Sequence, residues 1–144
     1  MKHFILTSII AAVALMSAAG HASAQSKDDR PYNLQKAYEV LQKDHDEEQA
    51  LKLLGEQIKS TPDNVECWLL MCRIYRNQKE YGRAMSSVNE AIRVNKPKKS
   101  GFVNSTLYWW KSSVYDDMDN NEQEIEWLKK ALDAARKDNK ENVQ

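Results

Sequence analysis

The sequence predicts an all-α protein made of repeated helical hairpins, and three observations lead to this class. The 144 residues include only three Pro and four Gly, which argues against β-rich, collagen-like and long disordered chains. Apolar residues recur at helical spacing from Leu34 almost to the C-terminus. The same pattern then returns at a nearly constant offset along the chain. We therefore expect one small domain of antiparallel helices.

The charge balance narrows the functions that are open to such a domain. The chain has 21 Lys and Arg residues against 21 Asp and Glu residues, a formal net charge of +0 and a pI near 6.8. Proteins that bind nucleic acids or anionic membranes carry an excess of Lys and Arg on one face. We therefore expect a protein or peptide partner and no nucleic acid.

Residues 1–24 have the pattern of a secretory signal peptide. One Lys precedes an apolar stretch from Phe4 to Ala19, and the small residues 22–24 form a cleavage site. The alternative is an uncleaved anchor helix, but the stretch is shorter than the ~20 apolar residues that span a bilayer. We expect an exported protein, periplasmic or secreted, with no membrane span after cleavage. The style of the signal indicates a bacterium.

Six helices follow a polar linker at residues 25–30, and short turns join them into three antiparallel hairpins. They span residues 31–44, 46–59, 63–78, 81–94, 102–117 and 121–138, and residues 139–144 form a polar tail. Apolar stripes justify these helices in chain order: Leu34, Ala37, Tyr38 and Leu41; Trp68, Met71, Cys72 and Tyr75; Tyr81, Ala84, Met85, Val88, Ala91 and Ile92; then Ile125, Leu128, Leu132 and Ala135. Polar or helix-breaking residues interrupt the stripes at residues 44–46, 60–63, 77–78, 95–101 and 119–120.

The three hairpins repeat one another. Equivalent sites are 34 residues apart in the first step and 40 in the second, as if six residues were inserted near residues 98–104. The aligned sites are Leu34, Trp68 and Tyr108; Leu41, Tyr75 and Tyr115; Ala50, Ala84 and Glu124; Leu54, Val88 and Leu128; and Gln57, Ala91 and Ala131. The repeats then span residues 31–62, 63–98 and 102–138.

The chain resembles the tetratricopeptide repeat family. The family pattern W-x2-L-G-x2-Y…A-x3-F stands in the second hairpin as Trp68-x2-Met71-Cys72-x2-Tyr75…Ala84-x3-Val88, and Pro62 lies at the site of the terminal Pro of the first unit. The second unit matches best and the third least, because Lys111, Ser112 and Glu124 replace apolar or small residues there. The resemblance implies an α-solenoid. An unrelated helical bundle would share the stripes but not the constant offset.

One flank of each hairpin indicates where the stack begins. It is polar in the first hairpin and apolar in the later two: Asn33, Lys36 and Val40; Cys67, Leu70 and Ile74; Leu107, Trp110 and Val114. In a stacked array this flank packs on the preceding repeat, so the first hairpin is predicted to be an N-terminal cap. Cys67 and Cys72 are then core residues, since side chains five apart on a helix point about 140° apart and cannot form a disulfide.

The resemblance implies a concave groove, lined by the first helix of each repeat, that holds a partner segment. The side chains predicted to line it are Gln35, Glu39 and Gln42; Leu69, Arg73 and Arg76; and Trp109, Ser113 and Asp116. Arginine binds carboxylates in a bidentate fork and tryptophan supplies contact area, so we expect an acidic partner segment. Gln35 and Glu39 replace the Lys and Asn with which relatives hold a terminal carboxylate, which argues against that ligand. The alternative is that the arginines pair with Glu39 and Asp116 and that Trp109 covers the insert.

The C-terminal end is predicted to leave an apolar face uncovered. Ile125, Leu128 and Leu132 match residues that face a following repeat in the earlier units, and Trp127 extends this face or is an isolated surface aromatic. Exposed apolar faces mark association sites, so we expect self-association or partner docking there.

Residues for catalysis, metal binding or cofactors are not predicted. His45 is the only His after the signal, which excludes catalytic triads that use His and His-rich zinc sites. The acidic run at residues 44–48 fits a solvated turn, and the calcium-loop pattern that begins at Asp117 lacks its essential Gly and final Glu. We expect a non-enzymatic interaction module or scaffold of the bacterial envelope. The alternatives are a self-associating structural subunit and, less favoured, an enzyme.

Overall fold

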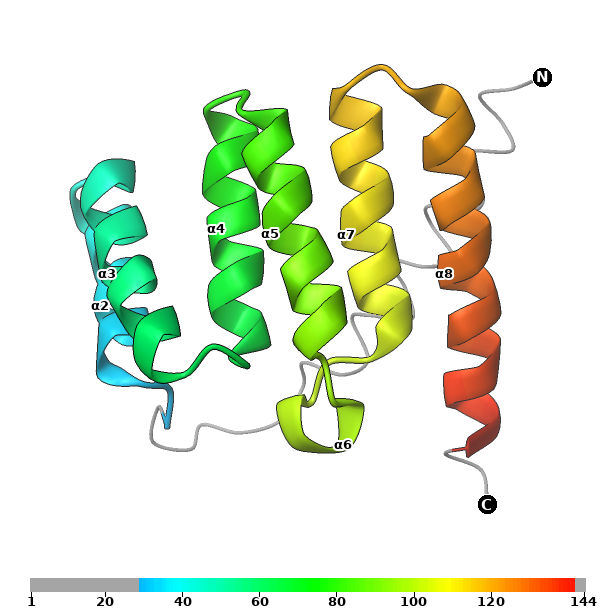
Figure 1. Ribbon diagram of the computed structural model, residues 1–144, viewed down its shortest axis with the longest axis horizontal. Coiled ribbons are helices and arrows are strands. Elements are labelled where there is room, and N and C mark those ends of the chain that lie inside the picture. The colour runs from blue at the N-terminus through cyan, green and yellow to red at the C-terminus, as the bar shows by residue number, and fades with distance from the viewer. Residues whose placement is uncertain (1–28, 142–144) are drawn as a thin grey trace. The chain divides into compact units, whose positions relative to one another are not determined.

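The computed structural model describes residues 29–141, without the side chains of residues 98, 99, 140 and 141. These residues form six long helices and one short helix, and they contain no strand (Figure 1). The helices are α2 (Tyr32–Lys43), α3 (Glu47–Ser60), α4 (Val65–Asn77), α5 (Tyr81–Val94), α6 (Pro97–Ser100), α7 (Asn104–Asp117) and α8 (Asn121–Glu141). The predicted all-α class is confirmed.

Side-chain caps explain why the helices begin where the sequence predicts. The Asp46 side chain accepts a hydrogen bond from the Gln49 N–H (2.9 Å), Asn64 accepts one from the Cys67 N–H (3.0 Å) and Asn120 accepts one from the Gln123 N–H (3.2 Å). Each bond satisfies a donor that the first helical turn leaves without an intrahelical partner. The six predicted helices are therefore present, with ends within a few residues of those expected.

Two features differ from the expected helices. The inserted segment contains the short helix α6, which ends at Gly101 in the left-handed region (φ 73°). Asn95 organises this segment: its Nδ2 donates to Phe102 O and to Asn104 Oδ1, both at 3.1 Å, and its Oδ1 accepts from Ser100 Oγ at 2.6 Å. In addition, α8 continues to Glu141, so the start of the predicted tail at residues 139–144 is helical.

The backbone itself repeats with the predicted offsets. His45, Lys79 and Asp119 are the non-glycine residues with positive φ in the described chain, at 52°, 59° and 56°. They lie in the turns α2–α3, α4–α5 and α7–α8, at the same 34- and 40-residue steps as the aligned side chains. The Glu80 N–H donates to Tyr75 O (2.8 Å), and the Asn120 N–H donates to Tyr115 O (3.0 Å), so the last two turns close in the same way.

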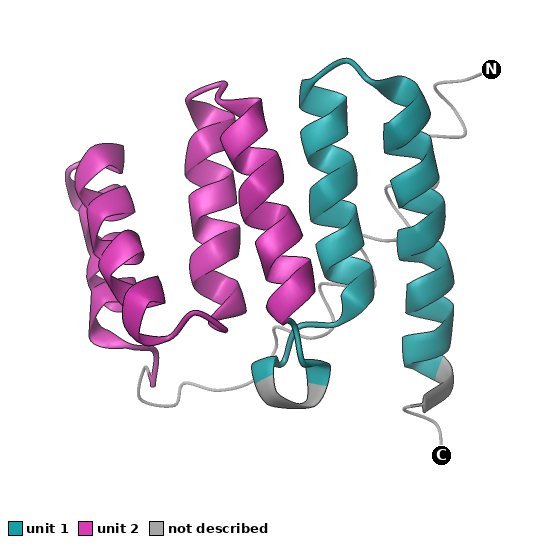
Figure 2. Cartoon of the chain, viewed as in Figure 1, with its two compact units in different colours: residues 1–23, 95–144 teal, residues 24–94 magenta. Residues whose placement is uncertain are grey.

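The described chain divides into two compact units (Figure 2). Unit 2, residues 29–94, contains α2 to α5. Its core joins the first hairpin to α4 and consists of Leu34, Ala37, Ala50, Leu54, Cys67, Leu70 and Ile74. The predicted packing of Cys67, Leu70 and Ile74 on the preceding hairpin is thereby confirmed. Cys67 and Cys72 are free and buried, as the sequence predicts.

Unit 1, residues 95–141 of the described chain, contains α6, α7 and α8. Helices α7 and α8 form an antiparallel pair. The fully or almost fully buried apolar residues of this unit are Leu107, Val114, Leu128, Ala131 and Ala135. Ser105 and Ser112 are also buried, and the Ser112 Oγ donates to Trp109 O at 2.7 Å.

The predicted signal peptide at residues 1–24 lies outside the described residues. Within residues 29–141, no helix is both long enough and apolar enough to cross a bilayer. Export and cleavage therefore stay predictions from the sequence pattern.

Candidate partner-binding site

A pocket of about 440 Å³ lies in unit 2. Its lining comes from the start and the end of the first hairpin's leading helix and from α4: Arg30, Tyr38, Leu41, Gln42, His45 and Arg73. Arg30 precedes α2 and His45 follows it, so one helix and its two flanks supply most of the wall. The pocket combines two guanidinium groups, a phenol ring, an amide, an imidazole and one apolar side chain.

One side of the pocket is a closed network around Glu66. The Arg30 Nη1 lies 3.3 Å from Glu66 Oε1, and the Tyr38 hydroxyl donates to the same oxygen at 3.0 Å. The Arg30 guanidinium also lies 4.5 Å from the centroid of the Tyr38 ring. Burial, followed by the charge and hydrogen bond of Glu66, raises the pKa of Tyr38 to about 12, although Arg30 and Arg73 oppose this change. Tyr38 therefore acts as a neutral donor.

Arg73 lies on the other side of the pocket, and its surroundings differ from those of Arg30. Its side chain is exposed and its guanidinium lies 6.0 Å from the Tyr38 ring centroid. Among the described residues it has no carboxylate within 4.0 Å. The expected alternative pairing with Glu39 is not found in this part of the chain, because Glu39 pairs with Lys36 at 3.3 Å. Arg73 is thus the cation of this pocket that an incoming carboxylate can engage.

In the network around Glu66, two side chains of this pocket, Arg30 and Tyr38, bind a carboxylate. A guanidinium N–H and a phenol O–H converge on one carboxylate oxygen, beside the apolar wall of Leu41 and the Tyr38 ring. Arg73 offers a second, planar set of donors to a second carboxylate. The arrangement therefore suits a peptide segment that carries an acidic side chain next to an apolar one.

The predicted groove residues of unit 2 have different environments. Arg73 lines the pocket, Glu39 is exposed on α2, and the half-buried Gln35 donates through Nε2 to Arg30 O. Arg76 is half-buried and has an interaction partner of its own. The prediction that Leu69 is exposed is wrong, because only 5% of its surface is accessible. Helix α4 has neighbours on more than one side and buries residues around most of its circumference, so Leu69 is core.

The predicted groove residues of unit 1 lie on α7. The half-buried Trp109 packs edge-on against Trp110, with ring centroids 5.9 Å apart. The Ser113 Oγ donates to Trp109 O at 3.1 Å. Asp116 is exposed. Burial of Glu124, followed by the charge of Asp116, raises the pKa of Glu124. Their participation in a groove stays a prediction.

The apolar face that the sequence predicts for self-association differs from the face found in the structure. Leu128 is only 1% accessible, so the expectation that it is uncovered is wrong: in unit 1 it is part of the core. Ile125 and Leu132 are half-buried. Trp127 is half-buried too, but two lysine ammonium groups lie over its ring. The face is therefore cationic and aromatic at Trp127, and less apolar than predicted.

Four pocket residues escaped the sequence analysis as binding residues: Arg30, Tyr38, Leu41 and His45. Tyr38 and Leu41 belong to an apolar stripe that predicts core, Arg30 lies in the predicted linker and His45 in a predicted turn. A usable signal was present, since Tyr38 and Leu41 are three apart on α2 and Gln42 follows them on the groove side. Spacing alone does not distinguish a half-buried pocket wall from a buried core.

The described residues contain no cluster of three or more His, Cys, Asp or Glu side chains that is arranged to hold a metal ion. They also contain no buried side-chain nitrogen or oxygen atom without a hydrogen-bond partner.

Antiparallel helical hairpins that recur at a constant offset define a helical-repeat protein. Residues 105–138 match the family model of the tetratricopeptide repeat, and this match supports a tetratricopeptide repeat protein. The matched segment is the third hairpin, whose residues depart most from the family pattern. No curated protein matches the chain. The matched repeat indicates a protein–protein interaction module.

Proposed function

We propose that this protein is a non-enzymatic interaction module of the bacterial envelope that binds an acidic segment of a partner protein in the pocket around Arg73. The observation that carries this proposal is the exposed Arg73 guanidinium in a pocket where another arginine and a tyrosine already hold a carboxylate. The tetratricopeptide repeat match at residues 105–138 supports a protein partner.

The envelope assignment rests on residues 1–24 alone. Their charged start, apolar stretch and small-residue cleavage site support export. N-terminal sequencing of the protein purified from a bacterial envelope fraction tests this part. A mature N-terminus at Gln25 is expected, whereas an intact Met1 would support the uncleaved anchor instead.

Partner capture tests the binding proposal. The tagged protein is used as bait on solubilised bacterial envelopes beside Arg73→Gln, and retained proteins are identified by mass spectrometry. Arg93→Gln is the matched control, because it removes the same charge from the same unit, in the ion pair of Arg93 with Glu90 (2.7 Å) and outside the pocket. Circular dichroism checks that all three baits have the same helical content.

A partner held by the parent protein and by Arg93→Gln but lost by Arg73→Gln supports the proposal. The bound segment would cover Arg73, so the contact with its carboxylate is buried in the complex. Loss of such a buried contact weakens binding by about 2–5 kcal/mol, enough to remove the partner in a wash. Equal capture by all three baits would assign the interaction to another surface, for which Trp109→Ala on α7 is the next variant.

A further inference from the structure

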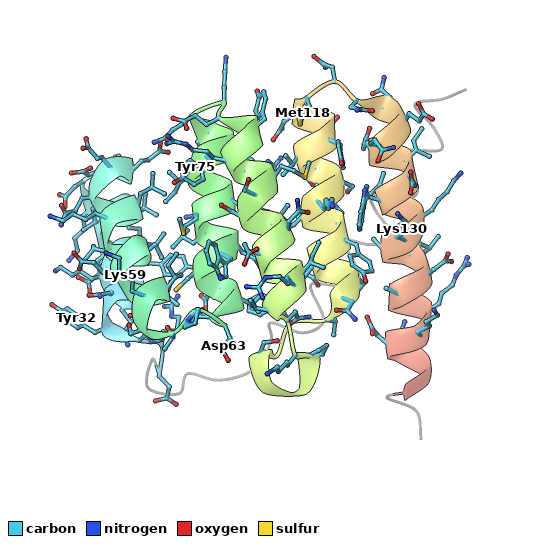
Figure 3. The ribbon with its side chains drawn as sticks, viewed as in Figure 1. Tyr32, Lys59, Asp63, Tyr75, Met118 and Lys130 are labelled. Carbon is cyan, nitrogen blue, oxygen red and sulfur yellow. The ribbon has the colours of Figure 1, made fainter. Side chains whose placement is uncertain are left out.

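A second surface, in unit 1, has a chemistry that the pocket lacks. The Lys111 Nζ lies 4.0 Å from the centroid of the Trp127 ring, and the Lys130 Nζ lies 4.1 Å from it. The Tyr108 ring meets the same indole edge-on, with centroids 5.5 Å apart and an interplanar angle of 64°. We call these four residues the lysine–tryptophan surface; Figure 3 labels Lys130 on α8.

This surface favours an additional anion. The ammonium groups of Lys111 and Lys130 both lie within cation–π distance of the Trp127 ring. Burial, followed by the charge of Lys130, lowers the pKa of Lys111. The charge of Lys130 therefore makes the protonated form of Lys111 more costly, and an incoming carboxylate would stabilise that form. Lys130 already pairs with Glu126 at 2.6 Å, so the carboxylate would be an addition to this ion pair. The half-buried indole adds apolar contact area beside the charges.

The complementary charge lies in unit 2, at the turn between α2 and α3. Asp44, Asp46 and Glu48 are exposed there, and we call them the acidic turn. In the described chain none of the three forms an ion pair. Many other carboxylates are paired: Glu39 with Lys36, Glu66 with Arg30, Glu80 with Arg83, Glu90 with Arg93, Glu126 with Lys130 and Asp133 with Arg136. The acidic turn thus concentrates negative charge that forms no ion pair within the described residues, although Asp46 also caps α3.

We propose that two copies of this chain associate head to tail, with the acidic turn of one copy on the lysine–tryptophan surface of the next. The two surfaces lie on different hairpins, so the contact is heterologous and extends to further copies or closes into a ring. This contact replaces the apolar self-association that the sequence predicts at Ile125, Leu128 and Leu132. Because its charges are exposed, it is weak and sensitive to salt.

Sedimentation velocity of the purified protein over a concentration series tests the proposal. The series is run at ~20 mM and ~500 mM salt, where the Debye length falls from roughly 20 Å to roughly 4 Å. We expect the average mass to rise with concentration at low salt and to stay near that of one copy at high salt. An average mass of one copy at every concentration and at both salt levels would overturn the proposal. The same result, with the same meaning, is expected if the acidic turn docks within its own chain.

Charge reversal locates the two surfaces. Lys111→Glu/Lys130→Glu is expected to weaken low-salt association at least about tenfold. Lys129→Glu/Lys137→Glu, which makes the same change of net charge at exposed sites of α8, is expected to retain it. Lys111→Gln/Lys130→Gln serves as a second variant should the reversed pair disturb folding, which circular dichroism would reveal. Equal association of the reversed pair and its control would reject the lysine–tryptophan surface.

A mixing experiment then identifies what occupies that surface. Asp44→Lys/Glu48→Lys is expected to lose association as well. Each variant keeps one intact surface, so an equimolar mixture with Lys111→Glu/Lys130→Glu should form dimers that do not grow further. A mixture that stays monomeric would show that the acidic turn is not the occupant and would overturn the head-to-tail contact.

Discussion

The second hairpin, α4 with α5, and the last hairpin, α7 with α8, have the same backbone but different chemistry where their helices meet. Cys72 and Ala84 are buried apolar residues in the second hairpin, and at the equivalent sites the last hairpin buries Ser112 and Glu124. Met71 is replaced in the same way by Lys111, whose ammonium group lies on Trp127. The repeat therefore tolerates polar residues at these sites when each has a partner or access to water.

Because these sites are polar in the last hairpin, its stability depends on the apolar residues that the hairpins have in common. Leu54 in the first hairpin and Leu128 in the last are equivalent and almost fully buried. Leu107, Val114 and Ala131 complete the apolar core of the last hairpin. The polar substitutions then change the surface of the last hairpin without changing its fold, and they create the lysine–tryptophan surface.

The largest effect is expected from truncating the shared core residue in either unit. Leu54→Ala and Leu128→Ala each remove a fully buried side chain, so each should lower the free energy of unfolding by about 2–5 kcal/mol. Urea unfolding followed by circular dichroism measures both. A loss below about 1 kcal/mol for Leu128→Ala alone would mean that the last hairpin does not depend on the apolar core that the first one uses.

Alkaline pH should destabilise unit 2 through groups that the last hairpin lacks. Burial, followed by the charge of Glu66, raises the pKa of Cys67 to about 12, and the pKa of Tyr38 is also about 12. Raised values mean that the fold favours the neutral forms. Their contribution is therefore complete below pH ~9 and is lost as the pH rises toward 12, on the order of a few kcal/mol in total.

Urea unfolding at several pH values between 8 and about 11 measures this loss. Cys67→Ala/Tyr38→Phe is the comparison, because it removes both titrating groups and should show a flatter decline. An identical decline in the parent protein and the double variant would assign the alkaline loss to other residues.

Neutralising Glu124 should stabilise the last hairpin. Burial and the nearby charge of Asp116 raise the pKa of Glu124, and only 3% of the residue is accessible. Its favourable contribution is present in acid and is lost as the pH rises, so the ionised carboxylate is a cost at pH 7. Glu124→Gln should therefore raise the free energy of unfolding at pH 7 by roughly 1 kcal/mol, with no gain in strong acid.

Thermal unfolding at pH 7 and pH 3 checks this expectation. Glu122→Gln is the matched control, since Glu122 lies in the same first turn of α8 and is exposed. A gain of equal size in the control would indicate a general charge effect at the helix N-terminus and not relief at Glu124.

The smallest effect is expected in the turns. Lys79 and Asp119 are equivalent residues in the left-handed region, which disfavours side chains with a Cβ. Lys79→Gly should stabilise by about 0.5–1 kcal/mol, and Asp119→Gly by less, because Asp tolerates this conformation better than Lys. Differential scanning calorimetry compares the two. A destabilising Lys79→Gly would show that the Lys79 side chain contributes more than its backbone strain costs.

Much of the fold was predictable because it depends on local patterns. Apolar spacing gave the helices, and residues such as Asp46, Asn64 and Asn120 marked their starts because a side-chain cap acts over three residues. The constant offset predicted that Cys67, Leu70 and Ile74 pack on the preceding hairpin. The same reasoning was wrong for Leu69 and Leu128, since it assigns one buried stripe to each helix and these helices bury more.

By itself, the sequence determined the class of protein and the number of hairpins in the described residues, because helical periodicity and repetition are properties of the chain. Only the tertiary structure decided which side chains meet. Arg30, Tyr38 and Arg73 converge from residues up to 43 positions apart, and Lys111 and Lys130 reach one indole from two helices. Such sites depend on side-chain directions and partial burial after packing, and periodicity does not encode either.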